Sequence, residues 1–358
     1  MALSKEGKKW ILEAHGSADD LKLVEFEVTE PGPEEVLLRV LMTTATYTDQ
    51  LIMRGNYMPS PPLPLTPGYD CIGEVLKVGS AVTTLSPGDR VAAMPQAHCM
   101  TTHLLQPANK VIKVNRSEDP KLQVACIRTG VTAYQMLHRC CSSRLGSNAV
   151  STTMLNHGAT GASGSFLLQC ALAAGVKATN IFATCACKNL NVLSAYGVHA
   201  IPYDQEPSFD EVVMRETNGR GVDAIFDAVV LGGYYERAQK CLSPGGKYIA
   251  YGFTQNEKSK SGVLSIPSVI YFFARMSMLN TWSCVDGRSA EFYMISSRRD
   301  SHPDEFEQDL QALLKLVADK TIVPSTSRTW RFTQAKDALV SIANNSHLGI
   351  QVVSCSTD

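Results

Sequence analysis

Three glycines spaced three residues apart are the clearest candidates for chemistry in this sequence. Gly158, Gly161 and Gly164 follow a predicted strand at 154–157 and precede a predicted apolar helix at 165–174. Small residues at such a turn let the backbone approach a pyrophosphate, and the free N–H groups at the start of the helix point at the phosphates. We therefore interpret this loop as a candidate nucleotide-binding site.

The loop alone also fits an ordinary turn between a strand and a helix, because the strict G-x-G-x-x-G frame needs a glycine where Ala159 stands. A further predicted strand at 180–184 completes a βαβ unit, and this context favours the cofactor interpretation. The residues expected to line the cofactor at this loop are Gly158, Ala159, Thr160, Gly161, Ala162, Ser163 and Gly164.

The end of the strand at 180–184 indicates which nicotinamide cofactor fits. In NAD-binding proteins an acidic residue about twenty positions after the glycine loop binds the 2′-hydroxyl of the ribose. Thr184 occupies this position, and Lys188 follows in the next loop. Because no carboxylate would repel a 2′-phosphate there and a cation is near, we predict NADP(H) as the cofactor. The alternative for Lys188 is an ordinary solvated side chain.

Eleven cysteines raise the question of a metal site. Zinc sites usually contain closely spaced thiols such as Cys-x2-Cys, because two thiolates on one turn can share a tetrahedral ion. The cysteine pairs at 140–141 and 185–187 have other spacings, and the eight histidines form no His-x3-His pair. We expect no bound metal and interpret the cysteines as small buried apolar residues.

The composition excludes several classes of partner. The chain of 358 residues carries 33 lysines and arginines against 34 aspartates and glutamates, a net charge of −1. This balance gives no electrostatic footprint for nucleic acid or a membrane surface, so we expect neither as a partner. The most apolar segment, 269–282, is interrupted by Arg275 and is shorter than the roughly 20 residues that cross a bilayer. An odd cysteine count without a predicted signal peptide leads us to expect a cytoplasmic protein.

Two kinds of structure must position these candidate residues, and the length also fits two domains. Residues 20–115 are predicted to form short strands separated by turns, including strands at 35–41, 73–79 and 89–94. From about residue 126 strands alternate with helices, which indicates parallel βαβ units. Later predicted elements are strands at 222–227 and 246–252, a helix at 306–318 and a final strand at 349–353.

The chain resembles the medium-chain dehydrogenase/reductase superfamily, and within it the zinc-free quinone oxidoreductase and enoyl reductase group. The most specific signature is Pro67-Gly68-Tyr69-Asp70-Cys71-Ile72-Gly73-Glu74-Val75, followed by Pro87-Gly88-Asp89-Arg90-Val91. Further stretches similar to the family lie at 48–57, 129–134, 217–223 and 242–246. The resemblance extends over nearly the whole chain.

The resemblance implies an α/β fold that joins a GroES-like β-rich catalytic domain to a Rossmann domain with a doubly wound parallel sheet. We expect the first part of the catalytic domain at residues 1–125, the NADP(H)-binding domain at 126–283, and a C-terminal part at 284–358 that returns to the catalytic domain. The active site would lie in the cleft between them. The segment 276–282 resembles the strand that extends the sheet across a dimer in relatives, so a homodimer is expected.

Zinc-dependent relatives bind their catalytic ion through a cysteine, a histidine and a second cysteine. The matching places here are Thr46, Tyr69 and Arg128, none of which is a thiolate or an imidazole. The resemblance therefore implies a zinc-independent reaction. Arg128 stands close to where a substrate would enter and could stabilise a developing oxyanion or bind an anionic group. A surface or interdomain ion pair is the alternative for this residue.

By resemblance, Thr46, Asp49 and Tyr57 lie near the nicotinamide, and Tyr57 could donate a hydrogen bond or a proton to an enolate. The alternatives are a packing role for Tyr57 and strand-end hydrogen bonds to the backbone for the other two. The resemblance also implies that Tyr203 lines the 2′-phosphate side of the adenosine, with an ordinary loop aromatic as the alternative. The remaining expected cofactor contacts are Thr132, Gly252 and Phe253.

Without a metal, the remaining chemistry is hydride transfer from NADPH to an activated acceptor. We predict an NADPH-dependent reductase of a small molecule, either a quinone or the C=C bond of an α,β-unsaturated carbonyl, in a biosynthetic pathway. Two alternatives stay open, a non-redox cyclase or lyase on the same fold and a protein that senses NADP(H). They rest on Arg128 and on Gly349-Ile350, where family members commonly have Gly-Lys.

Overall fold

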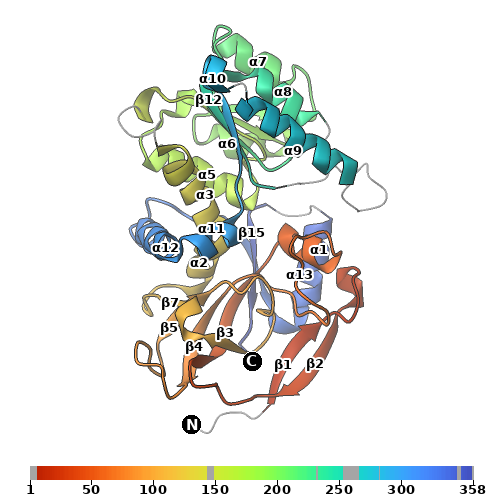
Figure 1. Ribbon diagram of the computed structural model, residues 1–358, viewed down its shortest axis with the longest axis vertical. Helices are drawn as coiled ribbons and strands as arrows, with labels where there is room; N and C mark the ends of the chain where they lie inside the picture. Colours follow the sequence, from red (N-terminus) through yellow and green to blue (C-terminus); the bar gives the residue numbers. More distant parts are fainter. Residues whose placement is uncertain are drawn as a thin grey trace. The chain divides into compact units, whose positions relative to one another are not determined.

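The computed structural model describes residues 6–142, 149–230, 233–252, 266–281, 283–344 and 348–356 (Figure 1). The chain divides into two compact units. Unit 1 contains Met1–Val131, Asp304–Lys320 and Pro324–Asp358, and unit 2 contains Thr132–Pro303 and Thr321–Val323.

Unit 1 is built around a sheet to which both halves of the chain contribute. The strand order is β14-β15-β3-β4-β5-β7, and β6 also pairs with β3. The last described strand, β15, lies antiparallel to β3, so the C-terminal residues complete the sheet that the N-terminal residues begin. The strands are β3 (Glu35–Ala45), β4 (Cys71–Val78), β5 (Arg90–Ala93), β6 (His103–Pro107), β7 (Val111–Lys113), β14 (Thr326–Arg331) and β15 (Ile350–Ser354), and β1 (Glu6–Ile11) pairs separately with β2 (Lys22–Glu27).

Helices and short turns connect these strands. The helical segments are η1 (Ala18–Asp20), α1 (Tyr47–Met53), η2 (Ala108–Lys110), α2 (Pro120–Ala125), the π-helical turn η3 (Cys126–Gly130), α12 (Pro303–Ala318), η8 (Phe332–Gln334) and α13 (Ala335–Ala343). The amphipathic helix predicted at 306–318 is α12, and its inward positions Leu310 and Leu313 are fully buried. This spacing of three residues places both leucines on one helical face.

Unit 2 contains a sheet of parallel strands in the order β10-β9-β8-β11-β12-β13. The chain proceeds from β8 toward one edge and then from β11 toward the other, so the order reverses between these two neighbours. This doubly wound arrangement confirms the predicted α/β class. The strands are β8 (Met154–Asn156), β9 (Ile181–Cys185), β10 (His199–Pro202), β11 (Val222–Asp227), β12 (Leu242–Ala250) and β13 (Ser289–Phe292).

The helices of unit 2 follow its strands. They are α3 (Val131–Gln135), the π-helical turn η4 (Met136–Cys140), η5 (Ala149–Ser151), α5 (Ala162–Ala173), η6 (Ala178–Asn180), η7 (Cys187–Asn189), α6 (Leu190–Ser194), α7 (Phe209–Glu216), α8 (Tyr234–Lys240), α9 (Ile266–Thr281), α10 (Ser283–Asp286) and α11 (Ile295–Ser301). Because β13 and α11 belong to unit 2, this unit extends to Pro303 rather than ending at residue 283, and it begins at Thr132 rather than at residue 126. Within the described ranges, no helix is long and apolar enough to cross a membrane.

The run 276–282, predicted as a strand at a dimer interface, is helical as far as it is described. Its residues end α9, and Trp282 lies outside the described residues. Phe272 and Met276, about one turn apart, are 2% and 6% exposed, so the buried side chains recur with a helical period. The side chain of Asn280 exchanges two hydrogen bonds with the backbone of β13, which is the strand beside β12. The prediction of a strand at 276–282 was wrong. The prediction of a homodimer was based on that strand and is left without support.

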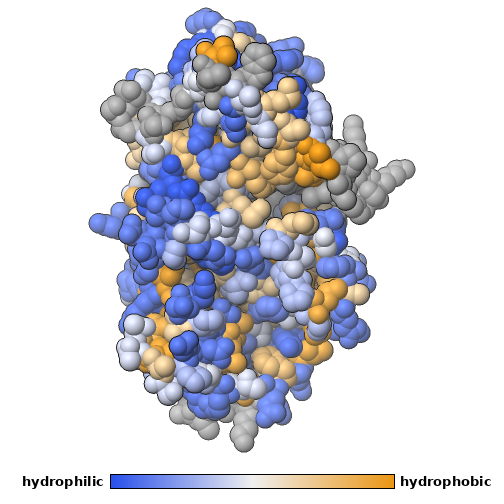
Figure 2. Space-filling model, viewed as in Figure 1, coloured by the Kyte–Doolittle hydropathy of each residue, from blue (hydrophilic) through white to orange (hydrophobic). Residues whose placement is uncertain are grey.

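Helix α9 also presents apolar side chains to the surface. Ile270, Tyr271 and Met278 are each more than half exposed. Figure 2 shows an apolar patch in the region of α9. A continuous apolar run that is buried on one helical face and exposed on the other cannot be told from a buried strand by composition alone. This is the physical reason for the wrong assignment.

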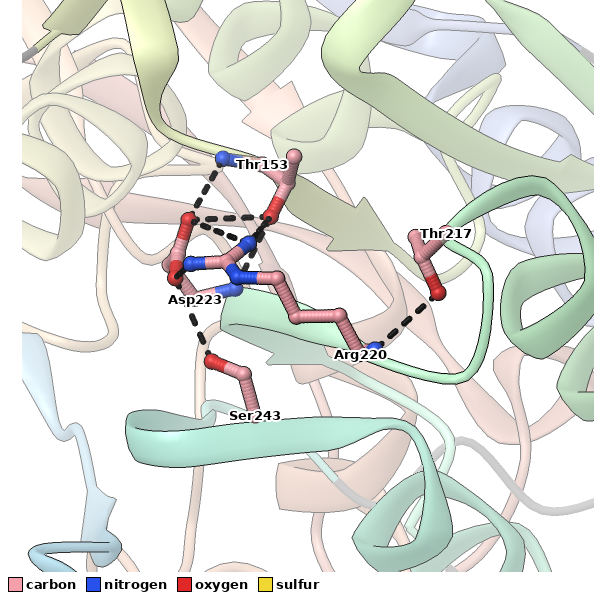
Figure 3. Close-up of polar contacts among 6 residues, drawn as sticks. Thr153, Thr217, Arg220, Asp223 and Ser243 are labelled. Atoms are coloured by element: carbon pink, nitrogen blue, oxygen red, sulfur yellow. Dashed lines mark hydrogen bonds and ion pairs between the residues drawn. The ribbon is translucent and has the colours of Figure 1, made fainter.

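A polar clamp of Thr153, Thr217, Arg220, Asp223 and Ser243 ties together the amino ends of three strands in unit 2 (Figure 3). The carboxylate of Asp223 accepts hydrogen bonds from the backbone and hydroxyl of Thr153, from Ser243 and from the guanidinium of Arg220. Thr217 accepts the N–H of Gly221 at 3.0 Å. Since the strands are parallel, the family-like stretch 217–223 lies at the edge opposite the glycine loop. Its contacts hold the sheet together at that edge.

Replacing Asp223 should destabilise the protein. Burial alone would raise the pKa of Asp223, but the donors from Thr153 and Arg220 outweigh it and hold the pKa below its usual value. Asp223→Ala should lower the free energy of unfolding by about 2 kcal/mol or more in urea denaturation, because it leaves several hydrogen-bond donors without an acceptor. The contribution is present at neutral pH and is lost as the pH falls through the folded-state pKa. Asp300→Ala, at a half-exposed ion pair, is the control and should change stability little.

Candidate functional site

The glycine loop lies at the carboxyl end of β8, beside the point where the strand order of unit 2 reverses. Ligands of open α/β sheets bind at such points. Gly158 has a φ of +67°, which residues with a Cβ rarely adopt. A Cβ on Gly164 would lie 2.4 Å from the carbonyl oxygen of Gly158, so only glycine lets the first turn of α5 pack this closely against the loop.

Helix α5 begins at this loop with its first N–H groups uncapped. Gly161 is the residue before the helix, and in the described part of the chain no side chain caps it. Thr160 to Ser163 are exposed or half-buried, whereas Ala159 is buried. The uncapped, positive end of this 12-residue helix is suited to phosphate. The geometry fits a pyrophosphate, and the individual cofactor contacts of residues 158–164 stay predictions.

Thr184 holds the glycine loop instead of facing outward. Its hydroxyl accepts the N–H of Gly158 at 3.1 Å, and its carbonyl accepts the N–H of Ala159 at 2.9 Å. The side chain is buried and also contacts Nδ1 of His157 at 3.2 Å. Burial lowers the pKa of His157, so this imidazole is neutral at neutral pH. Thr184 therefore acts through the loop, and a charged residue introduced there would disrupt the loop before it tested cofactor choice.

Groups of opposite charge follow β9 and β10. Lys188 is exposed in η7, and Tyr203 is 50% exposed after β10. The carboxylate of Asp204 accepts the backbone N–H of Cys187 at 3.0 Å, next to Lys188 in the chain. Tyr203 after β10 was predicted to line the 2′-phosphate, but no role was predicted for the carboxylate of Asp204 beside it.

The other predicted cofactor contacts receive less support. Thr132 is buried in α3, and Gly252 is half-buried two residues after β12. Phe253 lies outside the described residues. These three assignments stay predictions.

In unit 1, Thr46 and Asp49 form a closed hydrogen-bonded pair at the start of α1. The backbone N–H and hydroxyl of Thr46 donate to Oδ2 of Asp49 at 2.8 and 2.7 Å, and the N–H of Gly68 donates to Oδ1 at 2.9 Å. Asp49 is 1% exposed, and burial raises its pKa. This is a capping box, so the contacts correspond to the alternative of local hydrogen bonding rather than to a group that faces a ligand.

Asp70 is a second buried carboxylate of the same unit. Its Oδ1 accepts the hydroxyl of Thr44 at 2.6 Å, and its Oδ2 accepts the backbone N–H of Arg128 at 3.0 Å. The side chain is fully buried, and burial raises its pKa to about 6 despite the nearby guanidinium of Arg128. Asp70 stands within the signature 67–75, and the sequence predicted no role for it.

Arg128 lies in the π-helical turn η3 that follows α2. Such turns often occur at functional sites. The guanidinium donates to the hydroxyl of Thr48 at 3.3 Å and to that of Thr129 at 3.0 Å, and it lies 5.7 Å from the centre of the Tyr69 ring. Its Nε is buried and donates to no atom in the described ranges. The ion-pair alternative finds no carboxylate partner among those residues.

Tyr57 and Tyr69 are joined by their hydroxyl groups at 2.8 Å, with the rings edge to face at 6.0 Å. Tyr69 is fully buried and Tyr57 is half-buried. Unit 1 therefore contains a polar cluster in which Tyr57, Thr48 and Arg128 are partly accessible and Thr46, Asp49, Tyr69 and Asp70 are buried. Thr48 was missed as a member of this cluster, although it stands within a family-like stretch, and Tyr69 was grouped with Thr46 and Arg128 by resemblance but given no role of its own.

The residues of this cluster do not fit a catalytic metal. Thr46, Tyr69 and Arg128 supply a hydroxyl, a phenol and a guanidinium, and a guanidinium has no lone pair to offer a cation. Across the described ranges, no three histidine, cysteine, aspartate or glutamate side chains are placed to bind a metal ion. All but one of the described free cysteines are buried. The chemistry of these side chains thus argues against a zinc centre here.

Asp70 gives a pH-dependent prediction. One unit of pKa is worth about 1.4 kcal/mol, so a rise from 3.8 to about 6 makes the ionised carboxylate cost about 3 kcal/mol. Folded Asp70 binds its proton more tightly than the unfolded chain, so stability falls as the pH rises from about 4 to about 6. The free energy of unfolding of the wild type minus that of Asp70→Asn should decrease by that amount over this range in urea titrations. A constant difference would contradict the assignment.

The glycine loop gives a binding prediction. Gly164→Ala should weaken NADPH binding roughly tenfold or more, because the new Cβ forces the loop away from α5. Gly32→Ala, in unit 1 and outside the loop, is the matched control, since its Cβ would lie 3.1 Å from a side-chain oxygen of Glu35 and requires only a small adjustment. Nucleotide titrations followed by fluorescence measure both variants. Equal affinities in the wild type and Gly164→Ala would remove the loop from the binding site.

Comparison with known families places these features. Residues 32–143 match the family of the alcohol dehydrogenase GroES-like domain, and residues 196–353 match the zinc-binding dehydrogenase family. The chain is 26% identical to the synaptic vesicle membrane protein VAT-1 homolog of Rattus norvegicus over 352 residues, which cover 95% of this chain and 82% of that protein. It is 25% identical to phthioceranic/hydroxyphthioceranic acid synthase of Mycobacterium tuberculosis over 96% of its own length but only 15% of the synthase.

Solved structures share the fold over almost the full length. Escherichia coli quinone oxidoreductase complexed with NADPH has a TM-score of 0.81 and 21% identity, covering 97% of this chain and 99% of that one. The CurF ER cyclopropanase from the curacin A biosynthetic pathway has a TM-score of 0.79 and 19% identity over the same shares. The GroES-like and dehydrogenase matches, the strand order of unit 2 and these shared folds lead to one assignment. The chain belongs to the medium-chain dehydrogenase/reductase superfamily.

Proposed function

We propose that the chain is an NADPH-dependent, zinc-independent reductase that transfers hydride to a quinone or to the C=C bond of an α,β-unsaturated carbonyl. The observation that carries the proposal is the glycine loop, where Gly158 and Gly164 bring an uncapped helix to the switch point of a doubly wound sheet. The relatives that bear on it are the quinone oxidoreductase complexed with NADPH and a JamJ enoyl reductase that shares the fold. A bound nicotinamide supplies the hydride, and the chain supplies binding, orientation and charge stabilisation.

Tyr57 is the proposed donor to the substrate. It is half-buried, and the hydroxyl of Tyr69 lies 2.8 Å from its own hydroxyl. When Tyr57 donates its proton, Tyr69 donates a hydrogen bond to the phenolate that remains. A buried partner of this kind stabilises the charge without admitting water.

NADP(H) is proposed over NAD(H) because of Lys188. The ammonium group is exposed beside the end of β9, where a 2′-phosphate is expected, and Asp204 is already engaged by the N–H of Cys187. Charge-assisted contacts of a cation to phosphate are stronger than neutral ones. If the carboxylate of Asp204 faced the 2′-phosphate instead, the two negative charges would repel each other and weaken NADPH binding.

The non-redox alternatives remain distinct from this proposal. A cyclopropanase shares the fold, and a fold hosts more than one reaction. A lyase, a cyclase or an NADP(H) sensor would bind the nucleotide without consuming it.

Consumption of NADPH separates these functions. The purified chain is mixed with NADPH and a panel of quinones and enones, and the nicotinamide absorbance is followed. The proposal predicts acceptor-dependent loss of absorbance, which Gly164→Ala should reduce. Measurable NADPH binding without turnover of any acceptor would contradict the reductase assignment.

Tyr57→Phe should lower turnover by about 100-fold, in the range for loss of a general acid, while the dissociation constant of NADPH changes less than about twofold. Stopped-flow oxidation of NADPH and equilibrium titration measure the two quantities separately. Tyr196→Phe, at an exposed tyrosine of unit 2, is the control and should leave both unchanged. If binding and turnover fall together in Tyr57→Phe, the tyrosine has a packing role.

Lys188→Ala should weaken NADPH binding about tenfold, corresponding to about 1.4 kcal/mol, and should leave NADH binding unchanged. Asp204→Asn should act in the opposite direction or not at all, since it removes a negative charge near the expected phosphate. Parallel titrations with NADPH and NADH provide the comparison. The same loss for both nucleotides would show that Lys188 does not read the 2′-phosphate.

A further inference from the structure

Arg128 is the member of the polar cluster to which the proposed function gives no task. Its guanidinium is held on two sides by neutral hydroxyl groups, those of Thr48 and Thr129, and on a third by the ring of Tyr69. These contacts use one N–H from each terminal nitrogen. The guanidinium therefore keeps further N–H donors beyond its contacts with this part of the chain.

The positive charge of Arg128 is not cancelled by a contact ion pair. The two carboxylates of the cluster are satisfied by neutral donors, since Asp49 is bonded by Thr46 and Gly68, and Asp70 by Thr44 and by the backbone of Arg128 itself. In the described ranges, no aspartate or glutamate oxygen lies within ion-pair distance of the guanidinium. A partly buried cation whose neighbours are hydroxyls and a ring can still attract an anion.

The location of this cation has a chemical meaning. By the family resemblance, Thr46, Tyr69 and Arg128 match the metal-ligand positions of zinc-dependent relatives, and Arg128 lies against the ring of Tyr69. A metal at such a place polarises the oxygen of the substrate. Here a guanidinium occupies the cluster instead.

We propose that Arg128 forms an oxyanion-binding site, in which its guanidinium donates to the carbonyl oxygen of an α,β-unsaturated substrate as that oxygen becomes an enolate. This inference rests on the proposed function for the source of the hydride, but the site itself is a property of unit 1. The substrate class that it takes is a conjugated carbonyl compound whose reduction places negative charge on one oxygen.

The proposed reduction consists of a hydride transfer followed by a protonation. Hydride from NADPH forms a C–H bond at the β-carbon, the electron pair of the C=C bond shifts toward the carbonyl, and the carbonyl π bond opens to give the enolate oxygen. Arg128 stabilises that oxygen without giving up a proton. Tyr57 then protonates the α-carbon, and solvent returns a proton to Tyr57. In total, the nucleotide loses one hydride, and the acceptor gains this hydride with its two electrons and one further proton.

The first experiment needs no cofactor and no turnover. 4-Nitrophenol is titrated with the wild type and with Arg128→Met, and the absorbance of the phenolate form reports how strongly each protein holds an oxyanion. The wild type should lower the apparent pKa of the bound phenol, and Arg128→Met should abolish this shift. Arg116→Met removes an exposed arginine of the same unit and should behave as the wild type. A shift that persists in Arg128→Met overturns the oxyanion site.

The second experiment measures catalysis. Arg128→Met should lower kcat/KM for enones by about 100-fold, as for the loss of an oxyanion-hole donor, with the NADPH dissociation constant unchanged. Arg128→Lys keeps the charge but loses the planar donor group, so it should recover part of the loss, and it serves as the folded comparison if the methionine variant proves unstable. Unchanged kcat/KM in both variants would contradict the inference.

The two proposals fail in different ways. Turnover of enones that is indifferent to Arg128 leaves the reductase intact and removes the oxyanion site. Phenolate binding that depends on Arg128, in a protein that turns over no acceptor, supports the site and removes the reductase.

Discussion

The hydrogen bonds between Thr184 and the glycine loop are the constraint on which the proposed nucleotide site depends. The hydroxyl of Thr184 holds Gly158, its carbonyl holds Ala159, and Gly164 brings α5 against the same turn. The end of β9 thus fixes the loop that follows β8, and the N–H groups at the start of α5 are left for a ligand. A lost cap or a displaced loop costs about 1–2 kcal/mol. The loss of one group such as the Thr184 hydroxyl can therefore be enough to prevent the loop from holding a phosphate.

Unit 1 uses buried polar groups in a comparable way. The buried carboxylates of Asp49 and Asp70 accept hydrogen bonds from neutral donors rather than from a cation. The guanidinium of Arg128 therefore forms no contact ion pair with either carboxylate. Burial raises the pKa of Asp70 to about 6, although the guanidinium of Arg128 and the hydrogen bonds from Thr44 and the backbone of Arg128 act to lower it. Burying ionisable groups in this way carries a cost in stability, which is typical of functional sites.

Sequence reasoning reached the fold because its signals are local. Buried strand runs, the turn at Gly158 and the alternation of strands and helices predict parallel βαβ units within short windows, and the family resemblance implied that they form a doubly wound sheet. The contacts of Thr184 with the glycine loop were not predicted, because both faces of a central parallel strand are buried and no alternation indicates which way its last side chain points. The apolar run of α9 was ambiguous for a different reason, since a short apolar run fits either a buried strand or one face of a helix. The contacts of Arg128 with Thr48 and Asp70 join residues 80 and 58 positions apart, which only the folded sheet brings together.

The central claim is that this chain moves a hydride from NADPH to a conjugated carbonyl. The direct test is to supply NADPH deuterated at the transferring position of the nicotinamide, let the protein act on an enone, and locate the deuterium in the product by mass spectrometry and NMR. The account predicts one deuterium at the β-carbon and ordinary hydrogen from solvent at the α-carbon. A product without deuterium at the β-carbon, or formed without oxidation of NADPH, would contradict it.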